Sequence, residues 1–133
     1  MAKKVSLGVV TLLAVLVSAA HAQPVVRDGL LADSAGRTVY TFDKDTAGKS
    51  NCSGGCLTAW PMFVAKAGAK TQGDFGLIDA ADGQRQWTLK GKPLYYFAGD
   101  TQPGERNGDG SGGVWHVVPA NAASAASQGG AKY

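Results

Sequence analysis

The sequence predicts an all-β, β-dominated protein, a compact single domain of two pseudo-symmetric β-hairpin repeats with Gly-rich loops. The chain has 19 glycines in 133 residues, and each Gly inside a helix costs about 1 kcal/mol relative to Ala. Only one apolar run is long enough for a sizeable helix, and it lies at the N-terminus. One pattern of Tyr, Phe, Asp and Trp occurs twice at an offset of 55 residues, which indicates an internal repeat.

The N-terminal segment has the three-part layout of a cleavable secretory signal. Lys3 and Lys4 precede an apolar run over residues 5–19, and a small-x-small site follows at residues 20–22. The run is shorter than the ~20 residues that cross a bilayer, so no transmembrane segment is expected after cleavage. We expect residues 1–22 to be removed and the mature chain to be periplasmic or secreted. No Cys stands at the cleavage site, so a lipid anchor there is not expected.

The charge balance gives no sign of a nucleic-acid partner. The chain has 13 Lys and Arg against 10 Asp and Glu. Loss of Lys3 and Lys4 leaves 11 against 10, without a basic cluster that could follow a phosphate backbone. Residues 23–118 suit one small domain. Residues 119–133 are rich in Ala, Ser and Gly, and we expect them to form a disordered tail.

The two repeats, about 29–64 and 84–118, have the same order of features. A Gly-containing turn precedes a strand whose Tyr and Phe share one face, because strand side chains alternate. An Asp then opens a Gly-rich loop, and a Trp begins the next apolar stretch. The matched pairs are Tyr40 and Tyr95, Phe42 and Phe97, Asp45 and Asp100, and Trp60 and Trp115.

The strands are expected in consecutive hairpins. Residues 30–33 would pair with 38–42, and residues 84–89 with 94–97. A further strand is predicted over residues 75–78, with a turn after it. We expect seven or eight short strands around the paired aromatic residues, with the two halves facing each other because one repeat cannot bury its own aromatic face.

These motifs resemble a bacterial family known as the secreted repeat of unknown function, or predicted lipoproteins with a conserved YxFxxD motif. The resemblance is carried by Tyr40-x-Phe42-x-x-Asp45 and Tyr95-x-Phe97-x-x-Asp100, and by the Cys-x-x-x-Cys that leads to Trp60-Pro61. It covers nearly all of the expected mature chain. The resemblance implies architecture and export, and it implies no established activity. Members are often lipoproteins, from which this chain departs by lacking the lipidated Cys.

Cys52 and Cys56 are the only cysteines. In an oxidising compartment we expect them to form a disulfide, worth about 2 kcal/mol for so short a loop in the chain-entropy model. A redox pair or half of a metal site remains an alternative.

Asp45 and Asp100 stand where a strand enters a Gly-rich loop. A carboxylate there can accept backbone N–H bonds and pin the loop. Metal binding or general-base chemistry is the alternative. A weak site for a divalent metal ion could use Asp100, Asn107 and Asp109; no other cofactor is predicted. His116, the only histidine after residue 22, is expected to be an exposed strand residue.

No hydrolase, zinc-protease or phosphate-loop motif is present, and no catalytic residue is predicted. We therefore expect an exported, non-catalytic binding or interaction module of the cell envelope. Its partner would be an unknown envelope protein or a small ligand, bound for example in a groove lined by Tyr96 and Trp87. The alternatives are a periplasmic metal-binding or redox auxiliary protein and, less favoured, a carboxylate-based enzyme. The pattern does not specify the oligomeric state.

Overall fold

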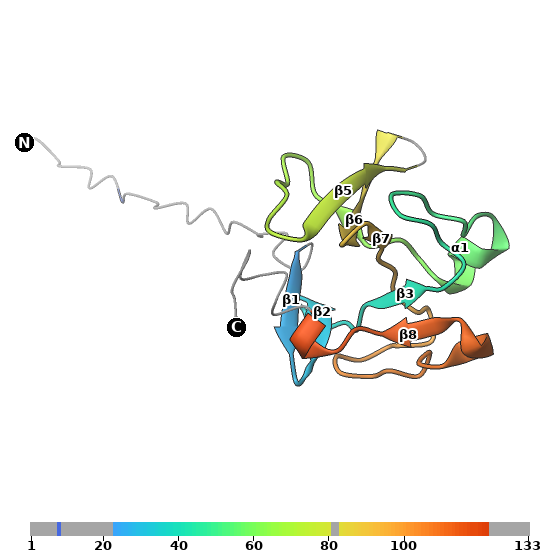
Figure 1. The fold of residues 1–133 in the computed structure, drawn as a ribbon. Helices are drawn as coiled ribbons and strands as arrows, with labels where there is room; N and C mark the ends of the chain where they lie inside the picture. The colour runs from blue at the N-terminus through green and yellow to red at the C-terminus, as the bar shows by residue number, and fades with distance from the viewer. Residues whose placement is uncertain (1–7, 9–22, 81–82, 123–133) are drawn as a thin grey trace, which may run out of the picture.

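The computed structural model describes residue 8 and residues 23–80 and 83–122 (Figure 1). The fold is β-dominated, as predicted, with one short α-helix among the named elements. In chain order the elements are β1 (Pro24–Arg27), β2 (Leu30–Asp33), β3 (Tyr40–Phe42), α1 (Gly55–Ala59), β4 (Val64–Ala65), β5 (Phe75–Asp79), β6 (Arg85–Leu89), β7 (Lys92–Pro93), the 3-10 helix η3 (Ser111–Gly113) and β8 (Trp115–Val117).

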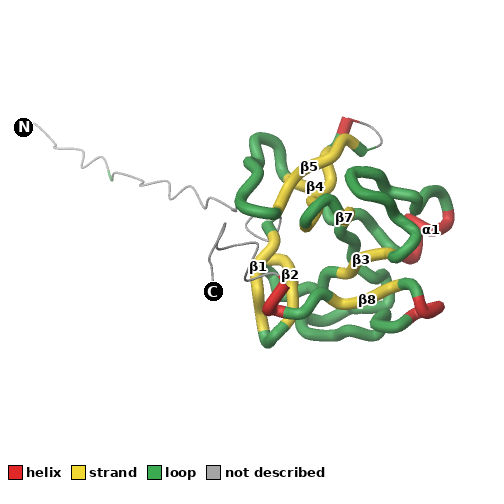
Figure 2. Tube along the Cα trace, viewed as in Figure 1, coloured by secondary structure: helices red, strands yellow, loops and turns green. Residues whose placement is uncertain are grey.

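The strands form three small antiparallel groups, β1–β2, β3–β8, and β4–β6–β5 with β7 also paired to β6. Loops connect them over much of the chain (Figure 2). Strand β1 was not predicted; Pro24 pairs with Asp33 and Arg27 with Leu30. In the part of the chain that the structure describes, no helix is long and apolar enough to cross a membrane.

Two hairpin turns have the same left-handed geometry. Asp28 and Gly29 have φ of 49° and 82°, and Lys90 and Gly91 have φ of 52° and 82°. Positive φ at both central residues is typical of the type I′ turn, whose twist matches that of the flanking strands. Asp is well suited to the first position, whereas a Lys there is uncommon.

The two predicted hairpins are present next to their turns. Val39 N donates to Leu31 O at 3.2 Å, and Leu94 N donates to Trp87 O at 2.9 Å. Before the turn, each residue of the first hairpin therefore corresponds to the residue 56 positions later in the chain, as Leu31 does to Trp87. After the turn the offset is 55, as for Val39 and Leu94. The second hairpin has one residue fewer in its turn.

The Tyr-x-Phe segments then leave their own hairpins, which corrects the predicted pairing. Strand β3 pairs with β8 of the other repeat, with Phe42 opposite Trp115. In the same way Tyr95 forms a bridge to Met62, and Tyr96 N donates to Pro61 O at 2.7 Å. This pairing between repeats brings the aromatic side chains of both repeats together. Neither repeat could cover its aromatic side chains alone.

A pseudo-twofold axis passes between Tyr40 and Tyr95. Tyr40 N donates to Tyr95 O at 2.8 Å, and Tyr95 N donates to Tyr40 O at 3.0 Å. Both side chains are fully buried. The two motif tyrosines thus form the reciprocal backbone pair at the centre of the molecule.

The core has two parts. One lies among the hairpins and consists of Leu31, Val39, Phe63, Ala65, Phe75, Trp87, Leu89, Leu94 and Val118. The other is central and consists of Tyr40, Cys52, Trp60, Tyr95 and Trp115. A groove lined by Tyr96 and Trp87 is not formed, because Trp87 is only 3% exposed and the Tyr96 ring packs 5.1 Å from that of Phe63.

The domain continues beyond residue 118. Leu30 forms a bridge to Pro119, and Ala120 N donates to Gly29 O at 2.8 Å. Residues 119–122 therefore belong to the fold and not to the predicted tail, because their backbone completes the edge beside β2. The predicted signal segment other than Gly8, and residues 123–133, lie outside the described residues.

Candidate functional site

Four aromatic rings of the repeat motif form one continuous stack. Trp60 and Trp115 lie face to face with ring centroids 3.8 Å apart. Phe42 stacks on Trp115 at 4.1 Å, and Phe97 lies against Trp60 at 4.5 Å. Each Trp thus contacts the Phe of the other repeat, and the stack joins the two halves.

The motif tyrosines and aspartates also pair across the repeats. Tyr40 Oη donates to Asp100 Oδ2 at 2.6 Å, and Tyr95 Oη donates to Asp45 Oδ2 at 2.7 Å. The Asp of each motif therefore bonds the Tyr of the other copy. These are charge-assisted hydrogen bonds, which are stronger than bonds between neutral groups.

The second oxygen of each aspartate holds its own loop. Asp45 Oδ1 accepts the backbone N–H of Asn51 at 2.6 Å, and Asp100 Oδ1 accepts that of Asn107 at 2.8 Å. The bonds span six residues in the first loop and seven in the second, so the offset between the repeats is 56 residues at these asparagines and 55 at the aspartates. These contacts support the structural interpretation of both aspartates.

Burial changes the acidity of the paired groups. It is the main factor that raises the pKa of the Tyr40 and Tyr95 hydroxyls well above the ordinary value, and the bonds to Asp100 and Asp45 add to the rise. Burial also raises the pKa of Asp45, although the bonds from Asn51 and Tyr95 oppose the shift. Both phenols therefore stay protonated near neutral pH and act as donors.

A third buried carboxylate was missed by the sequence prediction. Asp33 is 3% exposed and accepts the Tyr96 hydroxyl at 2.9 Å and the backbone N–H groups of Ala35 and Arg37. Burial is the first cause and Asp33 the second of a strongly raised Tyr96 pKa. The only signal in the sequence was an Asp directly before the Ser-Ala-Gly turn.

We expect alkaline unfolding to begin above pH 10, the ordinary pKa of tyrosine. Because the folded pKa values of Tyr40, Tyr95 and Tyr96 are raised, the folded state holds these protons longer than the unfolded state. Their contribution to stability is full below the unfolded pKa and falls as pH rises through the folded values. Tyrosinate absorbance and near-ultraviolet circular dichroism should change together, cooperatively. A gradual appearance of three tyrosinates in a folded protein would contradict this expectation.

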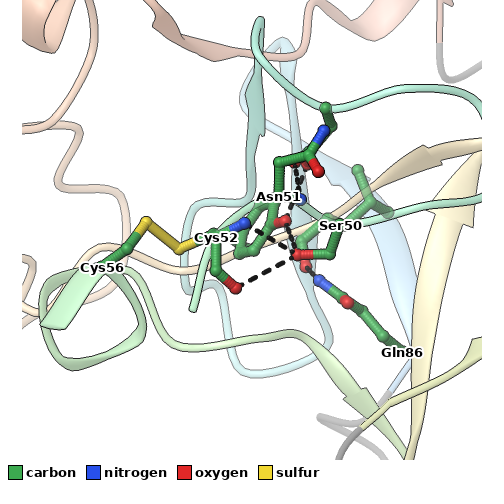
Figure 3. The surroundings of a disulfide bond; sticks show 8 residues. Ser50, Asn51, Cys52, Cys56 and Gln86 are labelled. Atoms are coloured by element: carbon green, nitrogen blue, oxygen red, sulfur yellow. Dashed lines mark hydrogen bonds between the residues drawn. A yellow bond between two sulfur atoms is a disulfide. The ribbon is translucent and has the colours of Figure 1, made fainter. Parts of the chain in front are cut away.

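The predicted disulfide between Cys52 and Cys56 is confirmed, with the two Cα atoms 5.3 Å apart. It lies beside the loop that Asp45 holds (Figure 3). Ser50 Oγ accepts Cys52 N at 3.2 Å and also bonds the Tyr95 hydroxyl. The disulfide therefore adjoins one of the two Tyr–Asp pairs.

Replacing both cysteines by Ser is expected to lower the free energy of unfolding by about 2 kcal/mol, because the unfolded chain loses a short covalent loop. Urea unfolding of the double variant against the oxidised parent measures the change. Reductant should lower the stability of the parent by a similar amount and leave the variant unaltered. A variant as stable as the parent would show that the disulfide has no structural role.

The predicted metal-site residues are engaged with the protein itself. Both carboxylate oxygens of Asp100 accept hydrogen bonds, and Asp109 Oδ1 accepts Val117 N at 3.1 Å. Asn107 lies in this loop and contributes its backbone N–H to Asp100. Within the described ranges, no group of three or more His, Cys, Asp or Glu side chains is placed to hold a metal ion.

His116 lies on β8 with its side chain 43% exposed, and its Nε2 is 2.7 Å from Asp43 Oδ2. Sequence reasoning did not single out Asp43; its position two residues before the motif Asp45 carries no chemical signal. The pair lines a cavity of about 360 Å³, and Thr41, Lys90 and Lys92 line it as well.

The fold defines a class of protein in which two β repeats interlock through exchanged strands, an aromatic stack and reciprocal Tyr–Asp bonds. The family described as the secreted repeat of unknown function matches residues 26–64 and 76–119. The chain belongs to this family, and the matched segments are the two interlocked halves. No curated protein and no solved structure matches the chain.

Proposed function

We propose that this protein is an exported, non-catalytic binding module of the periplasm or cell surface. The observation that supports the proposal best is the use of the motif side chains. Tyr40, Tyr95, Asp45 and Asp100 bond one another across the repeats, so the motif builds a scaffold. Recognition would then fall to the loops and cavities that the scaffold carries.

The rival functions find less support in the geometry. A carboxylate-based enzyme would need Asp45 and Asp100 accessible to substrate, yet each has both oxygens bonded to protein groups. A redox role for Cys52 and Cys56 would need easy access to both sulfur atoms, and Cys52 is only 4% exposed. A metal auxiliary would require the second loop to rearrange around Asp100.

The proposal includes export with removal of residues 1–22. The charged start, the apolar run and the small residues before Gln23 support it. Cell fractionation followed by N-terminal sequencing tests this part. A chain that begins at Gln23 in the periplasmic or extracellular fraction is expected, and an uncleaved cytoplasmic chain would refute it.

The binding role is tested on protein isolated from its native compartment. Native mass spectrometry, with and without reductant, and a metal analysis should show a chain two hydrogens light with no stoichiometric metal. A retained small molecule or co-purifying partner is expected under gentle isolation. A stoichiometric metal that is lost in Asp100→Ala, with the fold intact, would replace this proposal by the metal-auxiliary function.

A further inference from the structure

The cavity beside His116 lies between the β3–β8 pair and the β6–β7 turn. Its volume is about 360 Å³, within the range of small-ligand sites. We call it the Thr41 cavity; its lining includes Thr41, Leu89, Lys90, Lys92, His116 and Val118.

The pseudo-twofold axis relates this cavity to a filled space in the other half. Thr41 directly follows Tyr40, as Tyr96 follows Tyr95, and both lie on the Tyr-x-Phe segments that pair with the other repeat. The Tyr96 ring packs 5.1 Å from the ring of Phe63. The guanidinium carbon of Arg37 lies 4.3 Å from the Tyr96 ring centroid.

The neighbours of Tyr96 have counterparts that line the Thr41 cavity. At the offset of 55, Phe63 corresponds to Val118 and Arg37 to Lys92. The backbone bonds support this match, because Leu31 N donates to Val118 O as Trp87 N donates to Phe63 O. The Thr41 cavity is therefore the space in which the other half holds a tyrosine ring.

The chemistry of the two spaces differs at the end of the ring. Asp33, which accepts the Tyr96 hydroxyl, corresponds at the offset of 56 to Leu89, so this acceptor is replaced by an apolar group. Lys90 instead lines the cavity and can supply a positive charge there. Its one carboxylate, on Asp43, is already paired with His116.

The position of Lys90 adds an independent observation. It has φ of 52°, a left-handed conformation that a Lys adopts at a cost, whereas Asp28 fills the same position of the other turn of this type, between β1 and β2. Strain of this kind occurs preferentially where a side chain serves a function. Here it places a second cation at the cavity.

We propose that the Thr41 cavity binds a small aromatic anion, such as an aromatic carboxylate. The ring contacts Lys92 and Val118, as the Tyr96 ring contacts Arg37 and Phe63, and the negative charge faces Lys90. A cation over a ring face and an ammonium near a carboxylate are both favourable contacts. This inference rests on the binding role proposed above and names the ligand class for it.

The test is a titration of the mature chain with benzoate, followed by amide chemical shifts in nuclear magnetic resonance. Two probes of similar size serve as controls. Cyclohexanecarboxylate keeps the charge without the ring, and benzyl alcohol keeps the ring without the charge. Benzoate should give saturable shifts centred on Thr41, Lys92 and His116, and each control should bind about tenfold more weakly, because it lacks one of the two contacts. Equal binding of all three probes, or of none, would overturn the inference.

Two variants test the location. Thr41→Tyr should fill the cavity with the protein's own ring, abolish benzoate binding and leave the melting temperature unchanged or higher. Lys92→Met keeps the aliphatic stem, removes the cation and should weaken binding about tenfold. Lys70→Met, at an exposed lysine outside the cavity, should bind like the parent. If Thr41→Tyr fails to fold, Lys92→Met still decides, and parental affinity in Lys92→Met would overturn the inference.

The two proposals fail in different ways. A protein that ignores benzoate but retains another molecule or partner in its native mass refutes the aromatic-anion site and keeps the binding module. A protein that retains nothing and binds none of the probes refutes both.

Discussion

Replacing Trp115 by Ala is expected to lower the free energy of unfolding by about 3–5 kcal/mol, the usual cost of removing a large buried aromatic side chain. Trp115 is 5% exposed and lies between the rings of Phe42 and Trp60, with the Tyr95 ring at its edge. The substitution therefore removes the centre of the stack that joins the repeats. Urea unfolding followed by far-ultraviolet circular dichroism measures the loss.

Two comparisons make this result specific. Val26 is an exposed apolar residue on β1, and Val26→Ala should change the stability by no more than about 0.5 kcal/mol. Trp115→Phe keeps an aromatic ring in the stack and should be clearly milder than Trp115→Ala. A Trp115→Ala protein within about 1 kcal/mol of the parent would mean that the stack does not hold the halves together.

Replacing Asp100 by Ala is expected to cost about 2–4 kcal/mol, because it removes two hydrogen bonds to a buried carboxylate and leaves the Tyr40 hydroxyl without its acceptor. Asp100 is 5% exposed, whereas Asp45 is only half-buried. Asp45→Ala should therefore be less destabilising, although both aspartates occupy the same motif position. Chemical denaturation of the two variants gives the comparison.

A double-mutant cycle tests the crossed pairing itself. Tyr40→Phe combined with Asp100→Ala should show a coupling energy of about 1–3 kcal/mol, since the two side chains share a hydrogen bond. Tyr40→Phe combined with Asp45→Ala, two residues of one motif that bond Asp100 and Tyr95 instead of each other, should be additive within about 0.5 kcal/mol. Coupling within the motif and none across the repeats would contradict the crossed Tyr–Asp pairing.

Much of the fold could be predicted from local pattern. The Gly turns, the alternating strand residues and the repeat of Tyr, Phe, Asp and Trp indicated a two-repeat β protein, and the Cys52–Cys56 disulfide followed from compartment and count. The hairpins are present up to Val39 and Leu94. Local pattern could not show that the next residues change partner, because β3 pairs with β8 about 75 residues away in sequence. Strand β1 was missed since its four residues do not alternate clearly between apolar and polar types.

The candidate sites show the same division between local and distant information. The aspartates of the motif were recognised, yet their tyrosine partners come from the opposite repeat. Asp33 and Asp43 were missed because each acts with a residue far away in sequence, Tyr96 and His116. Such partners share no spacing that a single sequence could reveal.

Residue type and short spacing were sufficient to predict the β class, the internal duplication, the hairpin turns of the two repeats and the disulfide. How the two copies join depends on contacts between residues far apart in the chain, which are visible only in the folded protein. Each repeat presents an aromatic face that it cannot bury, so the strands exchange, the rings stack and each Asp bonds the Tyr of the other copy. The structure also shows that the duplication is imperfect. The Tyr96 ring packs against Phe63 in one half, and the smaller Thr41 leaves a cavity at the corresponding place in the other half.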